Sequence, residues 1–342
     1  MLIYAVLIVV YLVCSVASFG NRRTAKVVYI AVGVTLTLLA ALRPEGVDND
    51  YAEYVSHFNN YDQIALLEPT FKAIAWFSHT FLGSNYIFLF AVYAVLGVTL
   101  KFIAIRELSN FALLSVAIYI GQFFILHEMT QIRAGIASSF LLLSIKPLFE
   151  RNGRRFLLYA LCATAFHLSG IIILALWFIN PHRRLKIYLL LIPATILIYL
   201  LGVDILGIIP IPYLSAKIAI YQNLREYTDS VHNHINLFNS LYLVRLELCV
   251  LLFWAAPTLS KHNRYFTLLL KIYTISLAAM PLFAPIPVVA FRTHELLGIV
   301  EVILVPTLVF LFRPTNIAYL VVILYGFCLL MISLFYNRLL TA

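Results

Sequence analysis

The chain has 342 residues, of which 63% are hydrophobic and only 11% are charged, and its mean hydropathy is +0.96. Soluble globular proteins carry about 25% charged residues, so this sequence has too few polar side chains to cover a water-soluble particle. The composition predicts an all-α polytopic membrane protein with one helical domain over residues 1–342. It excludes a soluble enzyme, a disordered chain and a nucleic-acid-binding protein, and the formal net charge of +9 is assigned to membrane-anchoring loops.

Apolar stretches near the length of about 20 residues that a crossing needs follow one another along the chain. They cover residues 2–19, 27–42, 86–105, 110–127, 132–149, 187–202, 239–256, 265–283, 294–312 and 316–336. Segment 2–19 has no basic residues before it and no cleavage site after it, which predicts a retained span rather than a signal peptide. Segments 69–82 and 156–179 are ambiguous, and we therefore expect about 10–12 transmembrane helices.

Two larger connections, 43–68 and 203–238, hold most of the acidic residues. The first contains six of the 15 acids and one of the 24 bases, and the second contains three acids and two bases. The short connections carry the basic clusters instead, such as Arg22, Arg23 and Lys26. Because basic residues favour the cytoplasmic side, we expect the two large loops to face the periplasm.

Segment 156–179 conflicts with this charge rule if it crosses once, because basic residues flank it on both sides. A single crossing would place one of the two clusters, RNGRR or PHRRLK, on the wrong side. The sequence FHLSG at its middle is compatible with a helix break. Two short spans or a re-entrant pair of half-helices would restore the rule, and broken backbone at membrane depth indicates a cavity or burial in protein.

Charged and polar residues inside the predicted spans are candidates for a functional site, because each is costly in a membrane. Arg133 opens the apolar run IRAGIASSFLLLS. It could face an anionic ligand, or it could reach the headgroups from a helix end. His167 lies in the middle of an apolar segment, where it could accept a proton or simply form a buried hydrogen bond.

A second group of candidates occurs late in the chain, in the sequence FRTHELLG. Arg292 and Glu295 are three residues apart and would share a helical face, with His294 between them. Three prolines in the preceding MPLFAPIPVVA predict a broken helix there. The pair could form a ligand site or a local ion pair at a helix start, whereas Arg245, Glu247 and Glu301 are expected to be structural.

The acidic connection 43–68 mixes carboxylates with aromatic residues. Asp48, Asp50 and Glu68 could supply a general base or a cation site, or they could form a solvated face. Tyr51 and Tyr54 interleave with them, and carboxylates with aromatic rings are a common combination in carbohydrate-binding sites. The sequence contains no Walker A motif, no HExxH and no GxSxG, so it predicts neither an ATP-driven pump nor a metal site.

The order of these motifs resembles that of a known family. LRPEGVDNDYAEY, EPTF, QIRAGIASSFLLLS, ATAFHLSGIII and FRTHELLGIVEVILVP follow one another over most of the chain. This order is similar to that of the EpsG family of bacterial membrane proteins, which includes Wzy-type polymerases of O-antigens, capsules and exopolysaccharides. The arginine–alanine helix followed by Phe-His-x-Ser is the most specific part, and residues 203–238 match no shared pattern.

The resemblance implies a glycosyltransferase that joins oligosaccharide repeat units linked to undecaprenyl diphosphate at the periplasmic face of the bacterial inner membrane. It implies no cofactor, a fold similar to multi-span (GT-C-like) glycosyltransferases that include O-antigen ligases, and membrane lipids, a chain-length regulator and a flippase as partners. The catalytic candidates are His167, Arg133, Arg292, Asp48, Asp50 and Glu295. The candidates for substrate binding are Arg43, Tyr51, Tyr54, Glu68, Gln131, Ser169 and His294.

Two other classes of protein remain open from the residues alone. A transporter or flippase for lipid-linked oligosaccharides would also use intramembrane arginines, but it is expected to show internal repeats, and none is evident. A membrane O-acyltransferase would use a histidine within an apolar span, which His167 offers.

Overall fold

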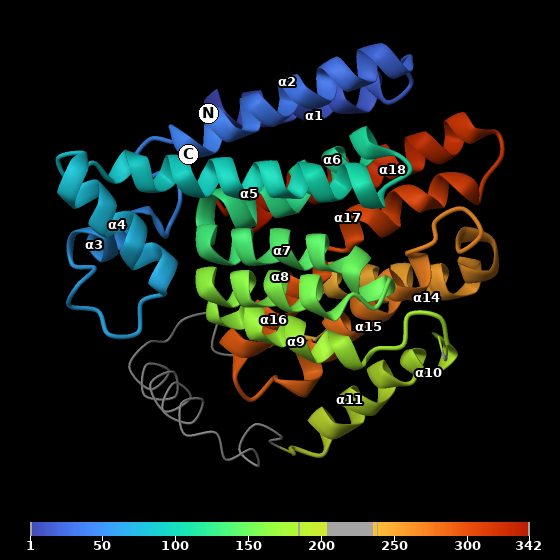
Figure 1. Cartoon of the computed structure of the whole chain (residues 1–342). Helices are drawn as coiled ribbons and strands as arrows, with labels where there is room; N and C mark the ends of the chain where they lie inside the picture. Colours follow the sequence, from blue (N-terminus) through green and yellow to red (C-terminus); the bar gives the residue numbers. More distant parts are fainter. Residues whose placement is uncertain (1, 184, 204–234, 238, 341–342) are drawn as a thin grey trace.

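The computed structural model of the protein describes residues 2–183, 185–203, 235–237 and 239–340. Within these ranges the chain is mostly helical, and its β-type contact is an isolated antiparallel bridge between Asp48 and Leu340 (Figure 1). Five helices are long and apolar enough to cross a membrane, and five shorter apolar helices accompany them. The prediction of an all-α polytopic membrane protein is confirmed. Most of the connection 203–238 lies outside the described residues.

The helices follow the predicted spans closely. The long ones are α2 (Arg22–Ala41), α5 (Tyr86–Leu108), α7 (Ile132–Phe149), α14 (Ser240–Leu259) and α18 (Thr315–Met331), which continues into η7 (Ile332–Tyr336). Shorter ones are α1 (Leu2–Ala17), α6 (Ala112–Ile118), α10 (Leu185–Leu189), α11 (Leu191–Leu200) and α15 (Phe266–Leu282). Their inward faces form one continuous apolar core, while large apolar side chains such as Trp254 and Leu200 lie exposed on the outside, as a lipid-facing surface requires.

The helices run between two opposite ends of the molecule. At one end Asn263 Nδ2 donates a hydrogen bond to the Leu108 carbonyl at 2.8 Å, which joins the connection after α5 to the connection after α14. At the other end the Tyr4 hydroxyl donates to the Leu340 carbonyl at 2.8 Å. Both chain termini therefore lie together, on the same side of the molecule as α3 (Tyr51–Asn59) and α4 (Pro69–Phe81) (Figure 1).

We call these the basic end and the α3–α4 end. The connections at the basic end carry Arg22, Arg23, Lys26, Arg106, Arg151, Arg154, Arg155, Arg183, Lys186, Lys261, Arg264 and Arg313. The acidic connection 43–68 lies at the opposite end. This separation of charge is the pattern from which the positive-inside rule predicts a cytoplasmic basic end.

Segment 156–179 is a helical hairpin. Helix α8 (Gly153–Phe166) runs inward to His167, and the chain returns through η3 (Leu168–Ile171), α9 (Ile172–Ala175) and η4 (Leu176–Phe178). The Arg151 guanidinium donates to the carbonyls of Trp177 and Ile179, so both ends of the hairpin lie at the basic end. A single crossing is therefore wrong, and both basic clusters lie on one side, as two short spans or a re-entrant pair of half-helices would each require.

The turn of this hairpin depends on a glycine. A Cβ atom at Gly170 would lie 2.5 Å from the carbonyl carbon of Ala163, which is a clash with backbone that cannot move aside. The absent side chain lets the returning arm pack directly on α8 and holds His167 at the tip.

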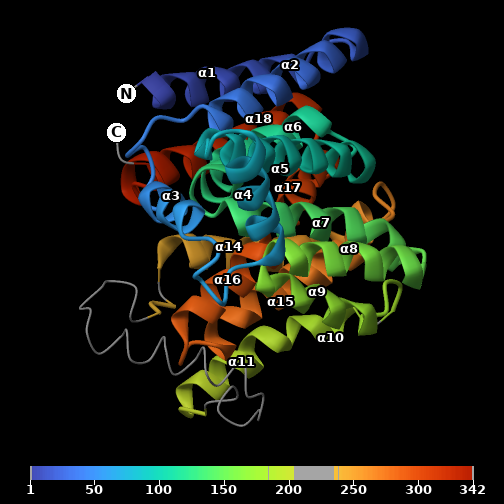
Figure 2. The same cartoon turned by 60° about the vertical axis from the view of Figure 1, so that its left-hand side comes forward.

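The other ambiguous segment, 69–82, is the short helix α4 at the α3–α4 end. Its 13 residues span about 20 Å, less than the hydrocarbon thickness of a bilayer. The Thr70 hydroxyl donates to the Ala165 carbonyl at 2.8 Å, beside the hairpin tip. Figure 2, in which this end is turned forward, shows α3 and α4 at the ends of the long helices. Helix α4 thus places Glu68, its N-cap residue, close to His167.

A π-helical segment before α7 brings two charges together inside the core. In η2 (Ile125–Thr130) the Glu128 carboxylate lies 2.5 Å from Lys101 Nζ, and both side chains are buried. A Cβ at Gly97 would lie 2.0 Å from Glu128 Oε2, and one at Gly135 would lie 2.1 Å from a carbonyl of η2. A side chain at Gly97 would displace the Glu128 carboxylate, and one at Gly135 would displace η2. Either change would separate Glu128 from Lys101 and leave a costly unpaired charge in the core.

The predicted break before FRTHELLG is confirmed, but the predicted start of the next span at residue 294 is wrong. Pro281 lies in the last turn of α15, and α16 (Pro287–Gly298) begins with Pro287 in its first turn, where a proline fits a helix. The helical path continues through α17 (Glu301–Leu304) and η6 (Val305–Phe310). The polar residues at 292–295 lower the local hydropathy without ending the helix.

The topology can be tested by single cysteines in a variant that lacks the four native ones. We expect an impermeant maleimide to label Asn60→Cys in intact spheroplasts, and to label Arg154→Cys and Arg183→Cys only after permeabilisation, because the two arms of the hairpin share the basic end. Opposite accessibility of the last two positions would contradict the hairpin, and the reverse pattern at all three would invert the orientation.

Candidate functional site

The Glu68 carboxylate joins three segments that are far apart in the sequence. Its Oε2 atom lies 2.6 Å from the Arg133 guanidinium on α7, and its Oε1 atom lies 2.9 Å from His167 Nδ1 at the hairpin tip. The side chains of Arg133 and His167 are each 19% exposed, and that of Glu68 is 9% exposed. We call these three residues the Glu68 cluster, and it brings together Arg133 and His167, two of the candidates from the sequence.

The electrostatics of the Glu68 cluster favour an ionised carboxylate. Burial would raise the pKa of Glu68, but the hydrogen bond with His167 and the charge of Arg133 outweigh it and lower the pKa to about 2. The carboxylate therefore fixes the Nδ1 side of the imidazole ring. Within the described residues no hydrogen bond engages His167 Nε2, so that nitrogen is available for a proton.

Aromatic rings surround the guanidinium of Arg133. It lies 5.5 Å from the centre of the Tyr54 ring and 5.9 Å from that of Phe71, within the range of cation–π attraction. Tyr51 stacks on Phe90 with ring centres 4.9 Å apart. Tyr51 and Tyr54 are buried, so they support the cluster from behind and do not present open faces to a sugar ring.

Arg43 and Asp48 are committed to each other. Arg43 Nε lies 2.8 Å from Asp48 Oδ2, both side chains are fully buried, and the guanidinium also donates to the Ala40 carbonyl. Asp48 Oδ1 accepts from the Asp50 backbone N–H at 3.1 Å. This pair stabilises the turn that leads from α2 into α3. Unlike Asp48, Asp50 forms no ion pair within the described residues.

The guanidinium of Arg292 has no direct partner. In the part of the chain that the structure describes, it forms no hydrogen bond and no ion pair, and the expected alternative of a pair with Glu295 is not observed. Burial raises the pKa of the Asp50 carboxyl, and Arg292 is the strongest of the charges that oppose this rise. Arg292 also acts electrostatically on Tyr54 and His167. It is therefore a half-buried free cation close to the Glu68 cluster.

Several buried polar atoms in the segments around Arg292 and the Glu68 cluster have no protein partner. Gln131 Oε1, Glu295 Oε2, Ser169 Oγ and Arg133 Nε have no hydrogen-bond partner within the described ranges. Glu295 interacts electrostatically with Arg292, and Gln131 contacts Glu295. Because native proteins satisfy most buried polar atoms, the open oxygens of Glu295 and Gln131 mark a place where a polar ligand could bind.

His294 does not belong to this group. Its Nε2 atom lies 3.2 Å from Arg245, and its Nδ1 atom lies 3.1 Å from the Ser276 hydroxyl. Arg245 also pairs with Glu301 at 3.1 Å, and Glu301 accepts from Tyr325 at 2.6 Å. His294 therefore belongs to a second buried hydrogen-bond network, which joins α14, α15, α16, α17 and α18.

Lys101, His127 and Glu128 are buried polar residues that were not among the candidates from the sequence. The Tyr119 hydroxyl donates to Glu128 at 3.0 Å, and the Ser138 hydroxyl contacts His127 Nδ1 at 3.1 Å. These residues anchor η2 immediately before Gln131 and Arg133. Among the described residues, no group of three or more His, Cys, Asp or Glu side chains is arranged to hold a metal ion.

The fold and the two buried networks define an all-α polytopic membrane protein with a partly exposed polar cluster at its α3–α4 end. The model of the EpsG family matches residues 26–340. The amylovoran biosynthesis protein AmsC of Erwinia amylovora is 24% identical over 318 residues, which cover 86% of this chain and 82% of that protein. The chain belongs to the EpsG family. No solved structure matches it significantly.

The lowered pKa of Glu68 predicts an acid-sensitive contribution to stability. Because the folded pKa of about 2 lies below the usual 4.5, the ionised carboxylate stabilises the fold above pH 4.5, and this stabilisation is lost as the pH falls from 4.5 to 2. We expect Glu68→Gln to lower the Tm of the purified protein at pH 7, since Arg133 loses its partner, by the equivalent of about 1–3 kcal/mol.

The same variant should lose less Tm than the native protein between pH 5 and pH 3. Glu53→Gln is the matched control, since the Glu53 side chain is 61% exposed and lies 3.6 Å from His57, outside the Glu68 cluster. An acid profile of Glu68→Gln that parallels the native one would show that Glu68 is not held ionised by the cluster.

Proposed function

We propose that the protein is a polysaccharide polymerase, which transfers a growing oligosaccharide from undecaprenyl diphosphate to the terminal sugar of a new lipid-linked repeat unit. Membership of the EpsG family and the likeness to an amylovoran biosynthesis protein support a role in polysaccharide biosynthesis. The observation that carries the reaction is the proximity of an unpartnered arginine, Arg292, to a histidine that a carboxylate holds by one nitrogen. The arginine can bind an anionic leaving group, and the histidine can accept the proton of a hydroxyl.

Arg292 is the main contact for the diphosphate in this proposal. A guanidinium offers two parallel hydrogen bonds to phosphate oxygens, and in a half-buried site its charge stabilises the negative charge that develops on the leaving group. Arg133 is already bound to Glu68 at 2.6 Å. It therefore contributes mainly by fixing that carboxylate, with its remaining N–H groups as secondary donors to the diphosphate.

His167 is the general base. Glu68 holds Nδ1 at 2.9 Å, so the ring is oriented and an imidazolium formed at Nε2 would be stabilised, as in other carboxylate–histidine pairs. Asp50 is the competing base, since it is half-buried and carries no ion pair of its own among the described residues. Asp48 is less suited, because it is bound to Arg43.

The transfer step follows from these positions. The acceptor hydroxyl forms the new glycosidic bond at the anomeric carbon of the donor sugar, and its proton passes to His167 Nε2. The bond from that carbon to the diphosphate oxygen breaks, and the electron pair leaves with the lipid diphosphate beside Arg292. Glu295 and Gln131, which have unpartnered oxygens near Arg292, orient the acceptor, and Ser169 lies beside the base.

The proposed setting is the periplasmic face of the bacterial inner membrane, with the α3–α4 end outward. A flippase that delivers lipid-linked units and a regulator of chain length are the expected partners. The direct test is purified protein with a lipid-linked repeat unit. A ladder of longer products supports the proposal, whereas unchanged substrate length in a preparation that binds the substrate overturns it.

Lysine at position 292 separates charge from shape. If Arg292 clamps a diphosphate with two hydrogen bonds, Arg292→Lys keeps the charge and loses the fork. The expected loss of polymer formation is about 30- to 1,000-fold, since one donor to developing charge is worth about 2–4 kcal/mol. Arg264→Lys, at the exposed basic end, is the control. A normal polymer ladder from Arg292→Lys at matched membrane expression would remove Arg292 from the site.

Replacing His167 by asparagine tests the base. The amide can still donate to Glu68 roughly where Nδ1 does, but nothing replaces Nε2. We expect His167→Asn to reach the membrane with near-native Tm and to slow transfer by about 10²- to 10⁴-fold, the usual contribution of a general base. His262→Asn, on the basic end, should retain full activity. A rate within a few-fold of the native one for His167→Asn would favour Asp50.

A further inference from the structure

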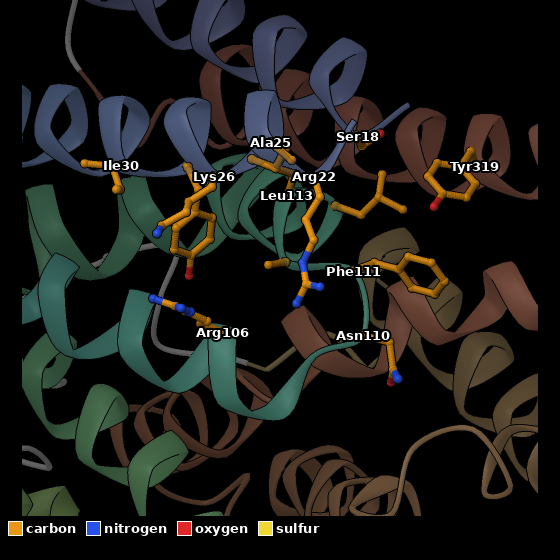
Figure 3. Close-up of a pocket in the computed structure, with 13 residues that line it drawn as sticks. Ser18, Arg22, Ala25, Lys26, Ile30, Arg106, Asn110, Phe111, Leu113 and Tyr319 are labelled. Atoms are coloured by element: carbon orange, nitrogen blue, oxygen red, sulfur yellow. The ribbon is translucent and has the colours of Figure 1, made fainter. Parts of the chain in front are cut away.

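A second candidate site lies at the basic end, away from the Glu68 cluster. A cavity of about 480 Å³ opens between α2, α5, α6 and α18, with Ser18 of the α1–α2 connection at its edge. Arg22 and Lys26 enter it from α2, and Arg106 enters it from α5, with Asn110 at its rim. Figure 3 shows Arg22 reaching from α2 toward α5, with Lys26 and Arg106 beside it. None of these residues has a role in the proposed transfer reaction.

The charges of this cavity are not compensated by the protein. Arg22, Lys26 and Arg106 are all exposed, and none has an ion pair in the part of the chain that the structure describes. The carboxylate next to them in sequence, Glu107, is bound to Lys146 on α7 at 2.5 Å. Three like charges around one cavity repel one another, so an anion bound there would be stabilised by all three.

An apolar groove continues from this cavity along the outside of the helices. It has a volume of about 410 Å³ and shares Tyr29, Ile30 and Arg106 with the basic cavity. Its remaining walls are mostly apolar residues of two helices, namely Gly33, Val34, Thr37 and Leu38 of α2 and Val98, Thr99, Phe102 and Ile103 of α5. Val34, Leu38 and Ile103 are each more than half exposed, so the groove belongs to the lipid-facing surface.

The direction of the groove matches the orientation of a lipid. Helix α2 begins at the basic end, and the stretch from Ile30 to Leu38 extends about 12 Å toward the middle of the helix. A lipid of the leaflet at the basic end would place its headgroup beside the three cations and a hydrocarbon chain along this stretch. A soluble anion would use the cations but would leave the apolar groove unexplained.

We propose that the cavity and the groove together form a binding site for an anionic phospholipid of the leaflet at the basic end. The phosphodiester and any second headgroup charge bind Arg22, Lys26 and Arg106, and one acyl chain lies between α2 and α5. Basic pockets between transmembrane helices on the cytoplasmic side are suited to such headgroups. The site joins α2 to α5, so an occupied site would hold α2 against the rest of the protein.

Native mass spectrometry of the delipidated full-length protein tests this assignment. Phosphatidylglycerol or cardiolipin should bind more tightly than phosphatidylcholine. The triple variant Arg22→Gln, Lys26→Gln and Arg106→Gln should weaken this binding on the order of 100-fold, since each of the three cations contributes about 1 kcal/mol. The control variant Arg154→Gln, Arg155→Gln and Arg264→Gln removes the same charge from the same end and should bind normally.

A second variant keeps the cations and fills the groove. Val34→Trp should weaken phospholipid binding but leave the weak binding of inorganic phosphate unchanged. Equal weakening by the control triple variant, equal binding of phosphatidylcholine, or phosphate binding as tight as that of the phospholipid would overturn the proposal. Tighter binding of undecaprenyl phosphate that excludes phosphatidylglycerol would assign the site to the carrier lipid instead. None of these outcomes depends on whether the protein polymerises sugars.

Discussion

The ionised carboxylate of Glu68 is the interaction on which the α3–α4 end depends. It binds the start of α4, the start of α7 and the tip of the hairpin to one another, through distances of 2.6 Å and 2.9 Å. Helix α4 is short and the hairpin is built of short helices, whereas α7 is long and largely buried, so the carboxylate fixes the two shorter elements against α7. The negative charge of Glu68, shared between Arg133 and His167, holds α4, α7 and the hairpin tip together. His167 Nε2 takes no part in this contact.

The charges within the protein fall into two kinds. Lys101 with Glu128, and Arg245 with Glu301, are fully enclosed and paired. Such pairs cost desolvation energy, but breaking one would cost more, so they tie the helices into fixed positions. Arg292 differs, since it is half-buried and unpaired among the described residues. Arg43, Arg133 and Arg245 each bind a carboxylate of the protein, whereas Arg292 binds none within the described residues, which leaves its charge available to a ligand.

Sequence patterns were sufficient for the parts of the fold that follow from hydropathy alone. The predicted spans agree with the helices to within a few residues, except at 294, where the polar residues of α16 masked a helix that begins at Pro287. The joint position of Arg133 and His167 was predictable, because both interrupt apolar runs.

Lys101 and Glu128 were missed for a physical reason: Lys101 sits near the end of a predicted span and Glu128 just beyond another, where each resembles an ordinary flanking residue. Only the π-helical turn and the two glycines bring them together. His294 was misplaced because neighbours in sequence face different sides of one helix.

The hairpin of residues 153–178 also sets the direction in which the helices after it run. A segment that enters and leaves by the same end adds no crossing, so every helix after residue 179 runs opposite to the direction that a full span would impose. If this segment had crossed, α14 would start at the basic end. Since it returns, α14 starts at the same end as α3 and α4. Gly170, packed against Ala163, is the position at which a side chain would block this turn, so the direction of the described helices after it follows from a close backbone contact.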